Sequence, residues 1–200
     1  GLEKPDHGTV RYHGQDVTAS TKAHRRLLRR GVQMIFQDPY TSLDPRMTVA
    51  ELVTEPLAAA GTGTARKRRD RAIELLDMVG MTPSMADRYP NEFSGGQRQR
   101  VGIARSLALD PDVLVCDEPV SALDVSVQAQ VVNLLRDLQR RLGVALVFIS
   151  HDLSVVRHIA DRVAVMYLGR LAETGPVETI FDNTAHPYTR ALLSASPALG

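Results

Sequence analysis

The sequence predicts an α/β fold in which a mainly parallel sheet carries an inserted helical subdomain. Two observations support this prediction. Short apolar runs with the character of strands alternate with helical segments, at residues 32–36, 113–116, 144–149 and 163–167. Between the first two runs, from about residue 38 to residue 105, only helical patterns occur. Strands separated by helices of this length are typical of a parallel sheet.

The first elements are a short strand within Gly8–Gly14, bounded by turn residues, and a buried strand at Val32–Phe36 that Asp38 and Pro39 bring to an end. Thr48 and Glu51 have the spacing of a capping box that starts a helix. Residues 66–79 form a further helix with apolar residues on one side. Its basic start, residues 66–69, is expected to be a solvated face.

The second half continues the alternation. Ser94 starts a helix that runs through Leu107, and the strand at residues 113–116 follows. A helix is expected from about residue 126 to 142, then the strand at 144–149. A further helix after Asp152 and a last core strand at Val163–Tyr167 complete the pattern.

Length and composition exclude several classes of protein. Two hundred residues suit one domain, or a core with a small inserted subdomain. The net charge of +1 does not call for nucleic acid or an acidic membrane surface as partner. The single cysteine, Cys116, excludes an internal disulfide and is expected to be a small buried hydrophobic residue. No apolar run reaches the roughly 18 residues that span a bilayer.

Asp117 and Glu118 directly follow a predicted buried strand, where ligands of open parallel sheets bind. One carboxylate there can hold Mg²⁺, and a second can orient and activate a water molecule. Adjacent acids at a strand end are also common in solvated turns, and the pair alone does not decide between the two interpretations.

Ser94, Gly95, Gly96 and Gln97 place a hydroxyl group and two glycines at the start of a helix. The free N–H groups and the dipole of a helix start attract phosphate, and glycine allows a close approach of the backbone. A plain N-capped helix after a glycine turn is the alternative.

Gln37 and His151 also follow apolar strands. A neutral imidazole at such a place can donate a hydrogen bond to a phosphate. Without further context, Gln37 would be an ordinary amide at a strand end.

Taken together, and in this order, these segments resemble the ATP-binding subunit of an ABC transporter, with Phe93 where leucine is usual. The resemblance implies a P-loop NTPase-like core that binds ATP and Mg²⁺. It makes Asp117 the magnesium ligand, Glu118 the general base and His151 the switch histidine. It makes Gln37 a sensor of the γ-phosphate and the magnesium ion.

In the same family, the signature motif, here Ser94–Gln97, contacts the ATP held by a second ATP-binding subunit. Ser121 and Asp124 would lie at the contact between the two subunits, and Asp124 is included among the nucleotide-binding residues. Whether the second subunit is identical or different is open.

The resemblance extends to the oligopeptide/dipeptide importer branch through Val32–Tyr40, Ser42–Arg46, Gln128–Leu135 and the tail at His186–Leu193. The branch also includes nickel and glutathione importers, so the cargo stays open among dipeptides, oligopeptides, nickel and glutathione.

The departure from the family is at the front: no Gly-x-x-x-x-Gly-Lys-Ser/Thr segment, the phosphate-binding P-loop, occurs in the 200 residues. The chain is therefore expected to start just after the P-loop, and a piece of a longer protein is favoured over a naturally shortened one, which stays the alternative. The expected parts are an incomplete ATPase core (1–37), the helical subdomain (38–105), the rest of the core (106–177) and the start of a C-terminal extension (178–200).

The implied function is ATP hydrolysis that powers peptide import, at the cytoplasmic face of the cell's inner membrane. Membrane-spanning permease subunits would dock around residues 37–47, an extracytoplasmic substrate-binding protein would take part indirectly, and nucleic acid is not expected. One alternative is a soluble ABC ATPase, which would not need the tail at 186–193. The other is a non-catalytic module that pairs with an intact subunit.

Overall fold

The structure is a computed structural model that describes residues 5–37 and 43–195. Its contacts divide the chain into two units, residues 1–147 and residues 148–200, and each unit is described by itself. Within the described residues, no helix is both long enough and apolar enough to cross a membrane.

The first unit begins with an antiparallel hairpin made of β1 (Arg11–Tyr12) and β2 (Gln15–Asp16). His13 and Gly14 form its turn with φ of 48° and 76°. Positive φ at both central residues matches the right-handed twist of a two-residue hairpin. The single strand expected within residues 8–14 is therefore wrong in one respect: Gly14 lets the chain reverse, and a second strand follows.

The sheet of the α/β fold contains three strands in the order β3-β4-β5. They are β3 (Val32–Ile35), β4 (Val113–Asp117) and β5 (Ala145–Ile149), and β5 crosses the boundary between the units. β3 and β4 are parallel, as predicted. The prediction that β3 is a buried strand is wrong, because β3 lies at an edge of this sheet: only Ile35 is buried, and Phe36 beyond the strand is 52% exposed.

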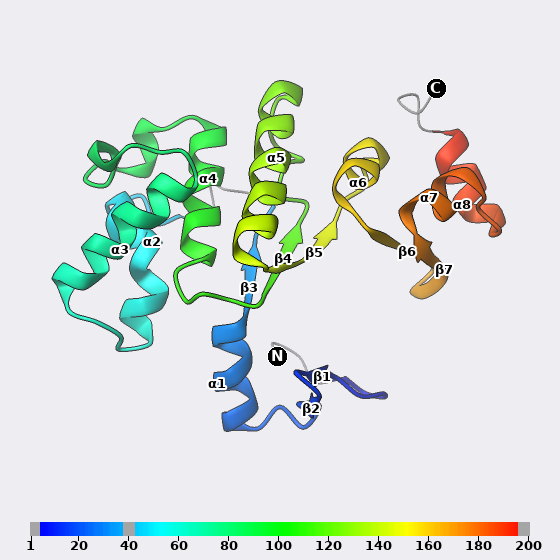
Figure 1. The fold of residues 1–200 in the computed structure, drawn as a ribbon, viewed down its shortest axis with the longest axis horizontal. Helices are drawn as coiled ribbons and strands as arrows, with labels where there is room; N and C mark the ends of the chain where they lie inside the picture. Colours follow the sequence, from blue (N-terminus) through cyan, green and yellow to red (C-terminus); the bar gives the residue numbers. More distant parts are fainter. Residues whose placement is uncertain (1–4, 38–42, 196–200) are drawn as a thin grey trace. The chain divides into compact units, whose positions relative to one another are not determined.

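Helices fill the chain between β3 and β4. The helix α1 (Lys22–Gly31) precedes β3, and α2 (Val49–Ala59), α3 (Ala65–Met78) and α4 (Gly95–Ser106) pack on one another (Figure 1). The 3₁₀ turns η1 (Pro83–Met85) and η2 (Pro90–Glu92) join α3 to α4. The helical character predicted for this region is confirmed for residues 43–105, whereas its boundaries as a subdomain stay a prediction.

Local signals explain where these helices start. Thr48 and Glu51 form the predicted capping box: the Thr48 N–H donates to the Glu51 carboxylate at 2.8 Å, and the Glu51 N–H donates to the Thr48 hydroxyl at 3.4 Å. Such reciprocal bonds satisfy two N–H groups that the helix itself leaves unpaired. The apolar sides of α2, α3 and α4 are buried, including Leu52, Leu76 and Ile103, and they form the core of this region.

The long helix α5 (Val125–Leu142) follows β4. It buries one side through Val131, Leu135 and Leu138, which recur at the spacing of an amphipathic helix. It ends at Gly143, whose φ of 67° is the left-handed conformation that closes many helices. The helix predicted from about residue 126 to 142 is confirmed.

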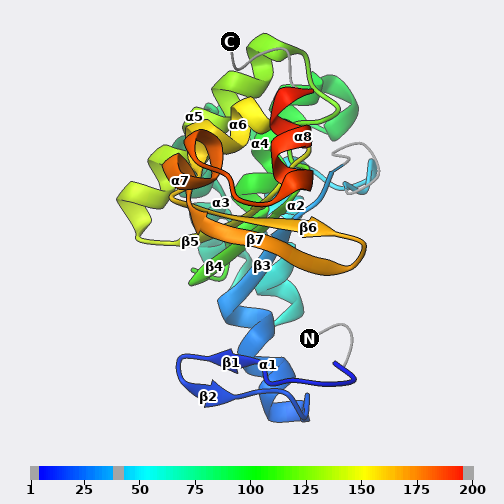
Figure 2. The same ribbon diagram turned by 90° about the vertical axis from the view of Figure 1, so that its right-hand side faces the viewer.

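The second unit contains α6 (Leu153–Ile159), an antiparallel pair of strands, and two short helices, α7 (Val177–Asp182) and α8 (Pro187–Ser194). The pair consists of β6 (Arg162–Tyr167) and β7 (Arg170–Pro176), which lie side by side (Figure 2). β6 is not the core strand that the sequence predicts, because only Val165 of its residues is buried. Leu168 and Gly169, with φ of 47° and 76°, reverse the chain so that β7 pairs with β6.

The Glu173 carboxylate on β7 holds the segment that leads into α8. It accepts hydrogen bonds from the Ala185 N–H at 2.8 Å, the Thr184 hydroxyl at 2.7 Å and the His186 N–H at 3.3 Å. The Ala185 N–H and the Thr184 hydroxyl lower the pKa of Glu173 to about 2, because they favour the charged carboxylate.

This arrangement predicts an acid-dependent loss of stability in the second unit. A carboxylate whose pKa is lower in the folded state stabilises that state above its unfolded pKa, and the stabilisation falls as pH drops toward the folded value of about 2. We expect the Glu173→Gln variant to be less stable than the wild type at pH 7, with the difference shrinking between pH 5 and 2. Urea unfolding across this range measures it, with the exposed Glu178→Gln as control. A difference that is the same at every pH would contradict the assigned cause.

Candidate functional site

Asp117 and Glu118 lie at the carboxyl end of β4. Along this strand Leu114 and Cys116 are buried, and Asp117 is half-buried on the other side. Burial raises the pKa of the Cys116 thiol to about 12, so Cys116 is the buried hydrophobic residue that the sequence predicts. The Asp117 side chain makes no hydrogen bond or ion pair with the described residues 5–37 and 43–195.

The backbone at Glu118 turns sharply. Its φ of 45° lies in the left-handed region, which residues other than glycine rarely adopt. The N–H and the hydroxyl group of Ser121 both donate to the Glu118 carbonyl, at 3.2 and 3.1 Å. This tight turn directs the chain away from the sheet immediately after the two acids. Unusual backbone conformations of this kind concentrate at functional sites.

Gln37 and Glu118, two of the predicted site residues, are in direct contact. The Gln37 amide nitrogen donates to a carboxylate oxygen of Glu118 at 3.2 Å. Gln37 follows β3 and Glu118 follows β4. Because the two strands are parallel, both side chains lie at the end of the sheet where the strands finish. The residues that follow Gln37, from Asp38 to Ser42, lie outside the described part of the chain.

The predicted signature residues form the start of α4. The Ser94 N–H donates to the Gln97 amide oxygen at 3.0 Å, and the Gln97 N–H donates to the Ser94 hydroxyl at 3.3 Å. This reciprocal pair is a capping box, so the N-capped helix of the alternative interpretation is present. Gly95 and Gly96 provide the first helical N–H groups, which such a helix start can offer to an anion.

Gly96 lies against Val127, a residue in the first turn of α5. A Cβ atom placed on Gly96 would be 2.4 Å from a methyl carbon of Val127. Sequence reasoning missed Val127. Its only signal was an apolar residue three positions after Asp124, in the first turn of an expected helix.

Ser121 and Asp124 lie in the segment that joins Glu118 to α5. Asp124 occupies the N-cap position of α5, but its side chain makes no capping hydrogen bond. Instead, the Leu123 carbonyl accepts a hydrogen bond from the Gln128 side chain at 2.9 Å. Ser121 and Asp124 are exposed, as residues at a contact between subunits would need to be in the free chain.

His151 belongs to the second unit. It is exposed between the end of β5 and Asp152, which caps α6 by accepting from the Ser154 N–H at 2.9 Å. The Ser154 hydroxyl is the main cause that lowers the pKa of Asp152, and the nearby His151 adds to it. The role of His151 stays a prediction, because it depends on groups in the first unit.

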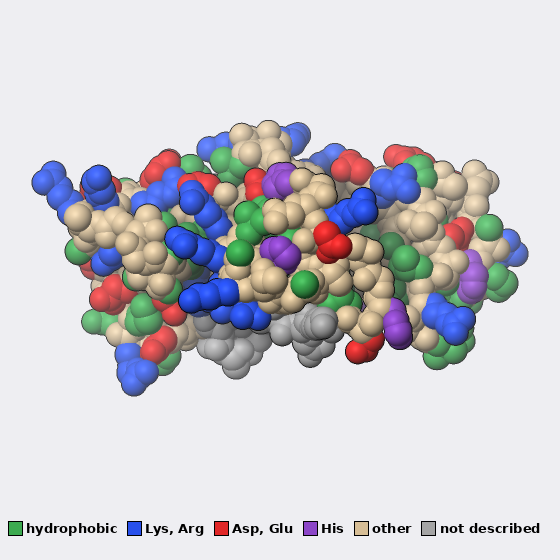
Figure 3. Space-filling model, turned by 90° about the horizontal axis from the view of Figure 1, so that it is seen from below, with side chains coloured by type: hydrophobic (Ala, Val, Ile, Leu, Met, Phe, Trp, Pro, Cys, Tyr) green, Lys and Arg blue, Asp and Glu red, His purple; other side chains and the backbone are tan. Residues whose placement is uncertain are grey.

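A basic surface lies away from Glu118. The helix α1 carries five cationic residues, and on the face seen in Figure 3 Lys and Arg side chains are prominent. Because α1 precedes β3 while Gln37 follows it, these cations lie at the other end of that strand. The residues concerned are Lys22, Arg25, Arg26, Arg29 and Arg30.

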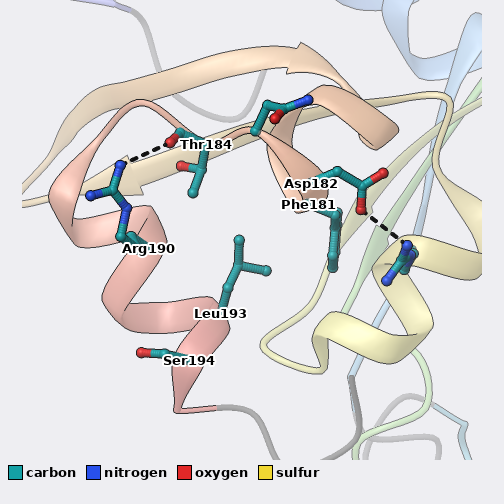
Figure 4. Close-up of a pocket in the computed structure, with 8 residues that line it drawn as sticks. Phe181, Asp182, Thr184, Arg190, Leu193 and Ser194 are labelled. Atoms are coloured by element: carbon teal, nitrogen blue, oxygen red, sulfur yellow. Dashed lines mark hydrogen bonds and ion pairs between the residues drawn. The ribbon is translucent and has the colours of Figure 1, made fainter. Parts of the chain in front are cut away.

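The second unit contains a separate hollow of about 680 Å³ between α6, α7 and α8 (Figure 4). Arg157 pairs with Asp182 there at 3.2 Å, and Arg190 donates to the Thr184 carbonyl at 3.4 Å. None of the predicted site residues lines it.

The donor atoms at the edge of the sheet fit magnesium. Carboxylate and amide oxygens are the ligands that Mg²⁺ prefers, and it usually combines one or two carboxylates with water and phosphate oxygens. Asp117 and Gln37 supply one carboxylate and one amide. Among the described residues, no three or more His, Cys, Asp or Glu side chains are grouped so that they could hold a metal ion by themselves.

Comparison with known proteins places these observations in one family. The family model described as "ABC transporter" matches residues 1–121, and the model described as "Oligopeptide/dipeptide transporter, C-terminal region" matches residues 172–200. The chain is 55% identical over 196 residues to a probable peptide ABC transporter ATP-binding protein of Sinorhizobium fredii, covering 98% of this chain and 56% of the relative. It is 52% identical over 198 residues to the di/tripeptide transport ATP-binding protein DppF of Pseudomonas aeruginosa, covering 99% and 61%.

The chain thus spans less than two thirds of the length of these relatives. The fold agrees with a solved structure, the dimeric post-hydrolysis state of the ATP-binding cassette MJ0796 bound to ADP and Pi. That structure is 31% identical, with a TM-score of 0.75 over 88% of this chain and 76% of the other. The predicted P-loop NTPase-like α/β class is therefore confirmed. The match over residues 1–121 shows that the chain belongs to the ABC transporter family, as part of its ATP-binding domain.

Proposed function

We propose that this chain is part of the ATP-hydrolysing subunit of an ABC importer for peptides. The contact between Gln37 and Glu118 carries the proposal, because it joins the ends of two parallel strands at the edge where ligands of such sheets bind. The names of the relatives and the match of residues 172–200 support peptides as cargo, in preference to nickel or glutathione.

In the proposed site, ATP supplies the phosphoryl group and Mg²⁺ neutralises its charge. Asp117 and the Gln37 amide oxygen would hold the magnesium ion. Glu118 would accept the proton of the attacking water, and the hydrogen bond from Gln37 holds its carboxylate in place. His151 would donate a hydrogen bond to the terminal phosphate.

The proposed enzyme works as a pair of ATP-binding subunits, identical or different. Ser94, Gly95, Gly96 and Gln97 would face the ATP of the second subunit, where the helix start favours negative charge. Ser121 and Asp124 would lie at the contact. The dimeric state of the related MJ0796 cassette supports this arrangement.

The pair would act at the cytoplasmic face of the inner membrane. Permease subunits would dock on the helical subdomain near residues 37–47, and a substrate-binding protein outside the membrane would deliver the peptide. Within residues 43–47, Asp44 is fixed by Arg46, whose guanidinium lies 2.9 Å from the Asp44 carboxylate and lowers its pKa to about 2. This exposed ion pair lies toward the end of the proposed docking segment.

Transport by the intact gene product with its permease subunits in proteoliposomes tests the proposal. We expect ATP hydrolysis to drive uptake of labelled di- and oligopeptides, with nickel and glutathione as parallel cargoes. If ATP hydrolysis drives uptake of nickel or glutathione but not of peptides, the proposed cargo is wrong. Absence of ATP hydrolysis by the complete complex would refute the proposed activity.

A further inference from the structure

The contact between Gly96 and Val127 joins the signature helix to the segment that follows Glu118. The backbone of Gly96 does not have a positive φ, so a side chain is not excluded by conformation. It is excluded by space, because a Cβ atom at Gly96 would be 2.4 Å from the Val127 methyl carbon. Carbon atoms pack at about 3.5–4.0 Å, so even alanine would force the Val127 side chain or one of the two helices to shift.

A series of hydrogen bonds connects the start of α5, which contains Val127, with the turn at Glu118. The N–H groups of Val127 and Gln128 donate to the Asp124 carbonyl at 2.9 and 2.8 Å. The Gln128 side chain donates to the Leu123 carbonyl at 2.9 Å. Together with the bonds from Ser121 to the Glu118 carbonyl, these contacts tie the turn from Glu118 to Val127 into one hydrogen-bonded segment.

We propose that Val127 is a positioning residue, which fixes the start of α4 against the segment from Glu118 to Asp124. This inference rests on the proposed function. In that function Glu118 serves the subunit's own ATP, while Ser94–Gly96 face the ATP of the second subunit. Through its packing on Gly96, the branched side chain of Val127 therefore connects the residues proposed for the subunit's own ATP with those proposed for the ATP of the second subunit.

The intact gene product provides the test. The Val127→Ala change removes the methyl groups that contact Gly96, so we expect the ATPase kcat to fall by about ten- to a hundredfold, the size of loss that slight misplacement causes. ATP affinity of the isolated subunit should stay unchanged, because the contact does not touch the subunit's own nucleotide. Val127→Thr, which keeps the branched shape, is the matched control and should retain most of the turnover.

A rescue experiment separates positioning from general damage. Gly96→Ala should lose turnover through the clash, and the Gly96→Ala/Val127→Ala protein should recover at least part of it, because the added Cβ then has room. The double variant should also unfold at a higher temperature than Gly96→Ala alone. Such non-additivity is the mark of residues in contact.

Two results would overturn the inference: wild-type turnover in Val127→Ala, or a double variant no more active than Gly96→Ala. Failure of the proposed function looks different. In that case the wild type hydrolyses no ATP and the positioning role falls with it, while the unfolding temperatures still report whether the two residues touch.

Discussion

Replacement of Glu118 by Gln is expected to lower ATP turnover of the intact protein by about two to four orders of magnitude, the usual contribution of a general base. Glutamine has the shape of glutamate but cannot accept the proton of the attacking water. Its amide oxygen can still accept the hydrogen bond from Gln37, which is 3.2 Å long in the structure. ATP binding should therefore survive, and an ATP-bound dimer should accumulate.

Single-turnover hydrolysis and sedimentation with ATP measure the two effects. Glu178→Gln is a suitable control, since Glu178 is an exposed acid in the first turn of α7 and has no role in the proposed site. Near-normal turnover of the Glu118→Gln protein would remove Glu118 from the mechanism. Loss of ATP binding in place of turnover would mean that the carboxylate mainly holds the nucleotide.

Local sequence signals predicted the elements that depend on local physics. The capping box predicted at Thr48 and the helix start predicted at Ser94 place the starts of α2 and α4 within a residue of the structure, because their bonds involve only neighbours in the chain. The parallel pairing of β3 and β4 follows from the helices between them. Strand β7 was not predicted although only Leu168 and Gly169 separate it from β6, because residues 170–176 contain no continuous apolar or β-branched run.

The same distinction holds for the candidate site. The family resemblance assigned Gln37 and Glu118 to one ATP and magnesium site, and the structure brings them into contact because they follow neighbouring parallel strands. The packing of Val127 on Gly96 could not be foreseen, since it depends on the angle at which α5 passes α4. Burial of β3 was overestimated because an apolar run does not show whether its strand has one neighbour or two.

The 200-residue chain by itself is expected to bind ATP at least about a hundredfold more weakly than the intact protein. A P-loop surrounds the β- and γ-phosphates with backbone N–H groups and a lysine, and no such segment occurs in the sequence. Hydrogen bonds to charged groups contribute about 1.5–3 kcal/mol each. Loss of two of them corresponds to at least about a hundredfold in affinity. ATPase activity should be at background.

Isothermal titration of the chain with Mg²⁺ and ATP measures this directly, after circular dichroism has shown that the chain is folded. The intact gene product under the same buffer conditions is the reference. Of the groups proposed for the subunit's own ATP, Gln37, Asp117 and Glu118 remain in the chain, and the two acids repel a phosphate unless a metal ion lies between them. Affinity equal to that of the intact protein would therefore mean that these residues, or others in the chain, form a phosphate site that does not require the P-loop.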